Sequence, residues 1–322
     1  MTLSEWGKRL DPQGKVDKIV EILAQQNEVL DDMLWVQGNL PTGHKTTIRT
    51  GLPAVAWRML NYGVKPGKSH TAQITDSCGM LEAYSQVDKA LADLNGNTAQ
   101  FRLSESTAYL EAMNQEQAKT LFYGDTNEFA AKYIGLAPRY SKLTKEDPKK
   151  EDTSDYIIDA GGTGNNCTSI WVVVWGDNGV FGIFPKGSKA GIDMQDKGQV
   201  TLDDGDGGHF EGYRAHLKWD CGVCVRDFRQ VVRISNIDTN NLANVDLVGL
   251  LVEATEKIHN LKLGKPVIYM NKTVRTALRQ QIRKTENVHL SLDTVAGKKV
   301  MSFDEIPVRR VDAIHNQEAA LV

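Results

Sequence analysis

The most regular pattern of apolar and polar positions lies in residues 104–123. Apolar residues recur there at spacings near three and four, which predicts one buried stripe along a helix made by Ala108, Leu110 or Ala112, Met113, Ala118, Leu121 and Phe122. The hydroxyls of Ser104 and Ser106 are placed to accept hydrogen bonds from free amides of a first turn, with Ser104 as the N-cap. Gly124 supplies the stop signal. The pattern therefore predicts a helix about 30 Å long.

Other segments follow the periodicity of strands. Residues 211–238 alternate polar and apolar positions over a long span, which predicts one long strand or a pair of strands. Residues 170–175 form a continuous apolar run between turn signals and predict a buried strand. Further strands are expected at 266–270 and 306–314, and further helices at 85–94, 242–261 and 272–284. Because strands and helices do not alternate regularly, the pattern predicts an α+β fold.

Two segments near the N-terminus carry apolar residues that need a surface to cover them. Residues 14–34 show a helical stripe that includes Val16, Leu23 and Leu30. This helix would dock on its own domain or on a neighbouring chain, and the pattern alone leaves both open. Residues 39–80 hold two extended segments around the turn-rich residues 61–68, which predicts a long hairpin.

Composition narrows the class of protein. The 322 residues are 41% hydrophobic, enough for a substantial core. No run approaches the roughly 18 apolar residues of a membrane span, and the N-terminus lacks the apolar core of a signal peptide. The net charge of −3 argues against a dedicated nucleic-acid binder. Four cysteines, unevenly placed, favour reduced thiols over a disulfide framework.

Two glycine-rich segments invite a phosphate-binding or nucleotide-binding interpretation. In residues 63–69 three residues separate the glycines where a phosphate loop needs four, and Pro66 removes an amide donor. Residues 161–164 lack the third glycine of a dinucleotide site, and a strand follows them where a helix should stand. A hairpin tip and a loop before a strand are the favoured interpretations.

A metal site is the strongest chemical alternative. His209, His216, Cys221 and Cys224 place four soft ligands within one short segment. However, strand residues three apart point to opposite faces, so we expect two buried thiols and two surface histidines instead. The acidic residues 203–206 do not match a calcium-binding EF-hand loop, and a solvated turn is expected. No serine nucleophile elbow is present.

The order of several segments resembles a known family of shell proteins. The predicted helix runs into LFYGD at residues 121–125 and then into FAAKYIGLAPRY at residues 129–140. Together these resemble the exit of the spine helix in major capsid proteins of tailed bacteriophages with the Hong Kong 97-type fold. Later segments resemble that family in the same order: WVVVWGDNGVFGIFPKGSKAG (171–191), HLKWDCGVCVRDFRQVVRISNID (216–238), PVIYMN (266–271) and FDEIPVRRVDAI (303–314).

The resemblance implies the Hong Kong 97-type capsid fold and a division of the chain. The expected parts are an N-terminal arm (1–38), an E-loop hairpin (39–80), a mostly P-domain segment with the spine helix (81–238) and a mostly A-domain segment (239–322). It implies a major capsid protein, not an enzyme, which assembles into pentamers and hexamers and closes an icosahedral head shell around phage DNA. An encapsulin-like compartment shell and, further off, a cytosolic metal- or nucleotide-dependent enzyme are the alternatives.

The implied partners are other copies of the chain, with scaffolding, portal and decoration proteins as further candidates. The shell would enclose double-stranded DNA without sequence-specific binding, would need no cofactor or membrane, and would be assembled in the host cytoplasm as part of the virion. The expected contacts between subunits are Tyr62, Lys65 and Lys68 on the hairpin, Val16, Leu23 and Leu30 on the arm, and Arg226, Asp227, Arg229 and Arg233 on the long alternating segment.

Overall fold

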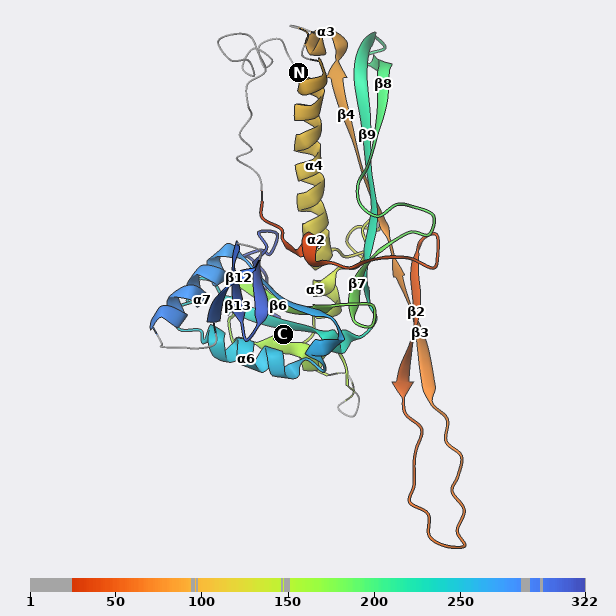
Figure 1. Ribbon diagram of the computed structural model, residues 1–322, viewed down its shortest axis with the longest axis vertical. Coiled ribbons are helices and arrows are strands. Elements are labelled where there is room, and N and C mark those ends of the chain that lie inside the picture. The colour runs from red at the N-terminus through yellow and green to blue at the C-terminus, as the bar shows by residue number, and fades with distance from the viewer. Residues whose placement is uncertain are drawn as a thin grey trace.

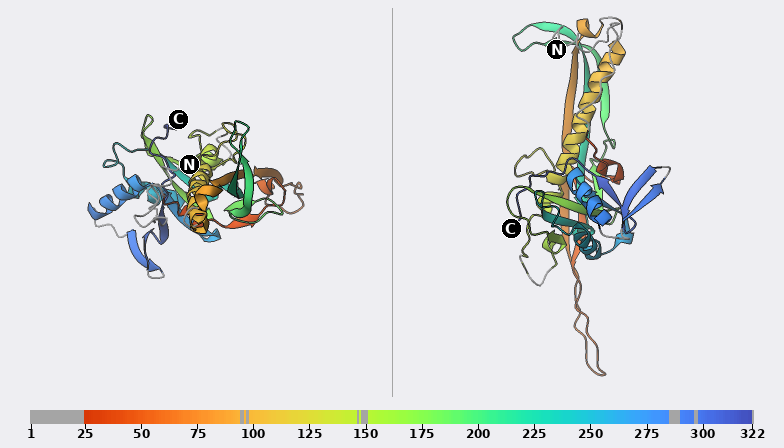
Figure 2. Two further views of the ribbon diagram at one scale, coloured as in Figure 1. Left: turned by 90° about the horizontal axis from the view of Figure 1, so that it is seen from above. Right: turned by 90° about the vertical axis from the view of Figure 1, so that its left-hand side faces the viewer.

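The chain folds into a body from which two projections extend in opposite directions (Figure 1). The computed structural model describes residues 25–93, 96, 98–145, 147, 151–284, 290–295 and 298–321. One projection, the limb, contains helix α4 and strands β4, β8 and β9; the other, the hairpin arm, contains β2 and β3 (Figures 1 and 2). Among the described residues, no helix is long and apolar enough to cross a membrane.

The limb is built along α4 (Thr98–Tyr123), a helix of 26 residues. It begins six residues before the predicted start, so the assignment of Ser104 as its N-cap is wrong. Inside the helix the hydroxyls donate backwards instead: Ser106 Oγ to the carbonyl of Arg102 at 3.0 Å, and Thr107 Oγ1 to that of Leu103. The buried residues Met113, Ala118, Leu121 and Phe122 confirm the second half of the predicted stripe, whereas Ala108 is exposed.

The predicted end of this helix at Gly124 is confirmed, and the structure explains the glycine. The amide of Gly124 donates to the carbonyl of Thr120, and the amide of Gly135 donates to the carbonyl of Gly124, both at 2.8 Å. A Cβ on Gly124 would lie only 2.4 Å from the carbonyl oxygen of Tyr133. The chain therefore returns against the helix end because both glycines permit close backbone contact.

Three antiparallel strands pack along α4: β4 (Gly79–Asp88), β8 (Asp193–Asp203) and β9 (His209–Val225). The helix predicted at 85–94 is largely wrong, because residues up to Asp88 pair with β9 and only α3 (Lys89–Ala92) is helical. Ser85 and Val87 are buried in that pairing. Asp88 marks the change, since its side chain accepts a hydrogen bond from the amide of Ala90 at 2.7 Å.

The body is organised around β6 (Cys167–Trp175), in which every residue is buried. Antiparallel β10 (Val231–Asp238) and β11 (Lys265–Met270) flank it. The long alternating segment is therefore two strands, β9 and β10, separated by η3 (Phe228–Gln230). The other strands of the sheets are β1 (Trp35–Gln37), β5 (Ile157–Asp159), β7 (Val180–Phe184), β12 (Leu290–Val295), β13 (Lys298–Phe303) and β14 (Ile306–Arg310).

Helices complete the body. The helix expected at 272–284 is confirmed as α7 (Lys272–Lys284). The one expected at 242–261 is shorter: α6 (Leu247–Lys257) begins where the side chain of Asp246 accepts a hydrogen bond from the amide of Gly249. The remaining short helices are α2 (Val29–Asp32), α5 (Leu136–Arg139), η2 (Thr153–Tyr156) and η4 (Leu261–Leu263).

One sheet of the body spans the boundary expected between residues 238 and 239. Strand β10 ends at that point, yet β10 and β11 both pair with β6. Strand β9 continues from the limb into the body, where it pairs with β7. The body therefore contains strands from both sides of the expected boundary, and β9 belongs to the limb and the body at once. The division into P-domain and A-domain stays a proposal.

Candidate assembly surfaces

The hairpin arm consists of β2 (Gly43–Gly51) and β3 (His70–Ser77), joined by residues 52–69. The two strands pair antiparallel from Gly43 opposite Ser77 to Gly51 opposite His70, which confirms the predicted hairpin. Residues 52–69 extend beyond this pairing and are exposed throughout (Figure 1). At their far end the amide of Tyr62 donates to the carbonyl of Met59, and Asn61 adopts a positive φ of 67°.

The far part of the arm exposes an unusual amount of apolar surface. Trp57 is fully exposed (103%), as expected for a side chain that touches nothing else in its own subunit. The other large apolar residues exposed on this segment are Leu52, Val55, Met59, Leu60, Tyr62 and Val64. An isolated two-stranded hairpin is marginally stable in water, and an apolar patch of this kind marks an interaction surface.

A buried ion pair fixes the base of the arm to the body. Arg139 on α5 donates to Asp76 Oδ1 on β3 at 2.7 Å, and the Asp76 side chain is only 4% exposed. The same guanidinium donates to the carbonyl oxygens of Gly135, Ile134 and Val223. The segment that leaves the spine helix therefore positions the arm.

Beside the arm lies a groove of about 800 Å³, lined by β2 and by the turn between β9 and β10. Three predicted contact residues, Arg226, Asp227 and Arg229, line it. Arg229 contacts both carboxylate oxygens of Asp227, at 2.9 and 3.0 Å. Burial raises the pKa of Asp227, but the hydrogen bonds and positive charge of Arg229 outweigh it, so the pKa is lowered. Asp227 therefore stays ionised and holds Arg229 at the groove.

Arg233 lies elsewhere, in the interior. Its guanidinium donates to the Glu318 carboxylate and the Tyr140 carbonyl at 2.8 Å and to Ser169 Oγ at 3.0 Å. It also stacks over the Trp171 ring. The side chain is 5% exposed, so the prediction that it contacts another subunit does not fit its position. Of the helix predicted at 14–34, the described residues are helical only in α2, Val29–Asp32. Leu30 in α2 is partly buried against the core, and Val16 and Leu23 lie outside the described residues.

The C-terminal segment was missed at the sequence level. Glu318 accepts hydrogen bonds from Tyr123, Ser169 and Arg233, and its backbone pairs with Cys167. Tyr123 is the last residue of α4, and its hydroxyl also accepts from the amide of His315. A single glutamate in a polar tail carries no periodic signal, so only the fold reveals that it joins the spine helix to the body.

The residues considered for a metal site are separated. Cys221 Sγ donates to Gln117 Oε1 at 2.9 Å, whereas Cys224 packs with Phe181 and Ile183 in another cluster. His216 contacts Glu82 at 3.0 Å and stacks on Tyr84, so it is partly buried, whereas we expected a surface histidine. His209 is exposed, as expected. Across the described part of the chain, no group of three or more ligand residues is placed to hold a metal ion.

Comparison with known proteins gives a consistent result. The family model described as Major capsid protein GP7 matches residues 11–322. The chain is similar to a solved chain of bacteriophage Epsilon15, with 35% identity and a TM-score of 0.79 over 100% of this chain and 97% of that one. It also resembles the bacteriophage JBD30 capsid, with 10% identity and a TM-score of 0.53 over 91% and 93%. No curated protein matches it.

A weaker likeness concerns the compartment alternative. The chain resembles the SrpI encapsulin complex of Synechococcus elongatus PCC 7942 with 11% identity and a TM-score of 0.40, over 74% of this chain and 97% of that one. This likeness is too weak to carry an argument about function.

Proposed function

The chain belongs to the family of Major capsid protein GP7 and has the Hong Kong 97-type fold, and from this premise we propose that its copies form the pentamers and hexamers of an icosahedral head shell. Shell assembly would take place in the host cytoplasm, and the closed shell would enclose double-stranded DNA without sequence-specific contacts. The subunit acts as a structural component and not as an enzyme. Scaffolding, portal and decoration proteins are its candidate partners.

The uncovered apolar surface of the hairpin arm is the observation that carries this proposal. Residues 52–69 contact little of their own subunit, although they expose Trp57 and six other large apolar side chains. When a neighbouring copy covers such a surface, the contact is stabilised by about 25 cal/mol for each Å² of apolar area removed from water. Many repeats of a modest contact then close a shell cooperatively.

The predicted contact residues divide accordingly. We propose that Tyr62, Lys65 and Lys68 contact a neighbouring subunit at the tip, and that Arg226, Asp227 and Arg229 do so at the groove beside the arm. Leu30, Val16 and Leu23 stay proposed contacts of the N-terminal arm. Arg233 leaves this group, because its donors are already used inside the subunit.

Negative-stain electron microscopy after size-exclusion chromatography tests the proposal. We expect closed polyhedral shells, or rings with fivefold and sixfold symmetry, in material expressed with the other head proteins. Particles purified from infected cells should contain nuclease-protected double-stranded DNA. Particles that contain an enzyme as cargo and no DNA would favour the compartment alternative. A subunit that stays monomeric under all these conditions would contradict the proposal.

A further inference from the structure

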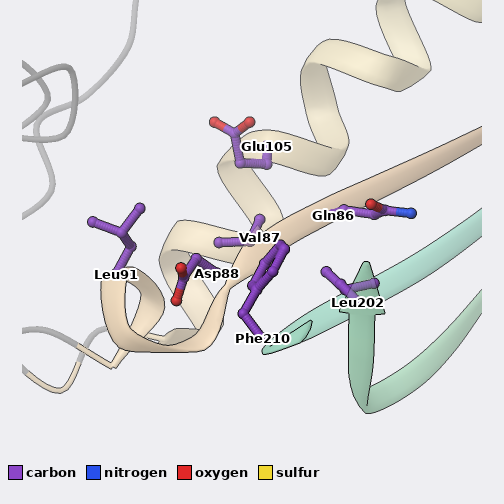
Figure 3. Close-up of a pocket in the computed structure, with 7 residues that line it drawn as sticks. All are labelled: Gln86, Val87, Asp88, Leu91, Glu105, Leu202 and Phe210. Carbon is purple, nitrogen blue, oxygen red and sulfur yellow. The ribbon is translucent and has the colours of Figure 1, made fainter. Parts of the chain in front are cut away.

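A small pocket lies beside α3, at the far end of the limb in Figure 1, and Figure 3 shows the residues that line it. Its apolar lining comes from Val87, Leu91, Leu202 and Phe210, and Gln86, Asp88 and Glu105 complete it. The volume is about 260 Å³. This is below the range of roughly 300–1,000 Å³ that is usual for small-molecule sites, so the pocket suits a single large side chain.

The turn beside this pocket is acidic. Residues 203–211 comprise the end of β8, the turn and the start of β9. They contain Asp203, Asp204, Asp206 and Glu211 and no lysine or arginine. In the described part of the chain, no ion pair involves these four carboxylates. Hydrogen bonds from Gln199 and Thr201 lower the pKa of Glu211. The positive charge of Lys89, which donates to Gln199, also lowers the pKa of Glu211. One lysine beside four carboxylates leaves the rim with more negative than positive charge at neutral pH.

The hairpin arm has the complementary chemistry. Residues 45–75 contain Lys45, Arg49, Arg58, Lys65 and Lys68 and no aspartate or glutamate. Trp57, next to Arg58, is fully exposed and is the kind of aromatic side chain that dominates interface energetics. A basic segment that carries an uncovered aromatic residue matches an apolar pocket with an acidic rim.

The two complementary features lie at opposite ends of the subunit. The pocket is at the tip of the limb, beside α3 and the β8–β9 turn, and the arm points the other way from the body (Figures 1 and 2). A subunit in this conformation therefore cannot fill its own pocket. A second copy can, and such a head-to-tail contact uses two different surfaces and propagates from copy to copy.

We propose that Trp57 of one copy inserts into the limb pocket of a second copy, while the cations of the arm face the acidic turn at residues 203–211. This inference rests on the proposed function, since it names the surface that receives the arm in an assembled shell. Trp57 supplies the buried anchor, and Arg58, Lys65 and Lys68 supply orientation and charge attraction. At physiological ionic strength this attraction acts within a screening length of about 8 Å.

Cysteine cross-linking in assembled particles is the direct test. One full-length variant carries Trp57→Cys and another carries Phe210→Cys, which lies at the pocket rim and is 37% exposed. The two variants are co-assembled with an excess of the unmodified chain, which supplies intact contacts elsewhere in the shell. After mild oxidation we expect disulfide-linked dimers in particles that contain both variants, and none in particles that contain only one of them. A matched mixture of Leu103→Cys with Phe210→Cys should not cross-link, although Leu103 is 65% exposed on α4.

A second measurement uses the yield of shells. Trp57→Ala and Phe210→Ala should each lower it about tenfold or more, as expected for an interface anchor and its pocket, while Leu103→Ala leaves it unchanged. Charge reversal at the acidic turn (Asp206→Lys) should lower the yield, and reversal of Arg58, Lys65 and Lys68 to glutamate in the same chain should recover part of it.

The outcomes separate the inference from the function. The inference would be overturned if the unmodified chain forms shells, the two cysteine variants give no disulfide between positions 57 and 210, and Trp57→Ala assembles with normal yield. The shell function would then stay intact. If the unmodified chain forms no shells, the proposed function itself fails. Circular dichroism of each variant subunit identifies any loss caused by misfolding, and the cross-link between folded variants then decides.

Discussion

The guanidinium of Arg233 and the carboxylate of Glu318 lie 2.8 Å apart in the interior, with side chains 5% and 9% exposed. Glu318 also accepts from Tyr123 at the end of the spine helix and from Ser169 on β6. The pair therefore brings together four parts of the chain that are distant in sequence: α4, β6, β10 and the C-terminal segment. Because both charges are buried, removing one leaves the other without compensation.

From this geometry we predict that Glu318→Ala lowers the free energy of unfolding by about 3–5 kcal/mol, the usual cost of leaving a buried charge unpaired. Urea unfolding of the isolated subunit measures it. The matched control is Glu253→Ala, which removes an exposed pair with Lys257 on α6 and should cost about 0.5 kcal/mol or less. Equal effects of the two substitutions would show that Glu318 does not stabilise the interior.

A second prediction concerns the base of the hairpin arm. Arg139→Ala removes the cation that pairs with the buried Asp76 carboxylate. Because the buried charge is then left without this partner, pairing between β2 and β3 near Asp76 should weaken. Amide hydrogen exchange of residues 43–51 should quicken about tenfold or more, equivalent to about 1.4 kcal/mol of local stability. Exchange in β6 serves as the internal control. Unchanged exchange in β2 would mean that other contacts hold the arm.

The sequence predicted the elements whose own residues determine them. The end of the spine helix at Gly124, the buried strand β6 and the hairpin arm follow from periodicity and turn residues close together in the chain. The interior role of Arg233 did not, because its partners Ser169 and Glu318 are 64 and 85 positions away. The same reason explains the missed strand at Ser85 and Val87, where pairing with β9 overrides a local helical pattern.

Interfaces are harder to predict than the fold, because exposure depends on the whole structure. Trp57 and Trp171 are both tryptophans in apolar stretches, but one is fully exposed and the other is buried beneath Tyr140. Only the three-dimensional arrangement shows which of them is available to a partner. The limb pocket likewise combines Val87 and Phe210, whose positions in the sequence give no sign that they meet.

A third prediction follows from the buried tyrosines. Burial and then the Glu318 carboxylate raise the pKa of Tyr123, and burial raises that of Tyr140. Since the folded state disfavours the phenolate, the stability they contribute is complete below about pH 10 and is lost as the pH rises above it, by up to about 1.4 kcal/mol per pH unit for each group. Unfolding midpoints measured from pH 8 to 11 should show this loss, and Tyr123→Phe should reduce its slope. A flat profile in the unmodified chain would contradict it.

The thiols give a fourth prediction. Burial raises the pKa of Cys78 to about 12 and also raises those of Cys221 and Cys224, so little thiolate is present at pH 8. A thiol-reactive disulfide reagent should label these cysteines slowly in the folded subunit and rapidly in denaturant. A bound zinc ion would also protect Cys221 and Cys224, and a chelator distinguishes the two causes. Labelling that a chelator accelerates, together with stoichiometric zinc by elemental analysis, would restore the metal-site hypothesis.

Deleting residues 61–68 should separate folding from assembly. These residues are exposed, and they lie beyond the last paired residues of β2 and β3, Gly51 and His70. Their removal therefore takes no side chain out of the core. We expect the melting temperature of the subunit to change by less than about 2 °C, since surface changes away from special contacts usually fall within about 0.5 kcal/mol. Shell formation should nevertheless fail, because the tip that contacts the neighbouring copy is gone. As a control, a Gly-Ser segment of equal length restores the reach of the loop but not the side chains of Tyr62, Lys65 and Lys68, and it should assemble no better than the deletion. Normal shells from either variant, seen by negative-stain electron microscopy, would show that residues 61–68 are dispensable and that the arm acts through its remaining residues, which include Trp57.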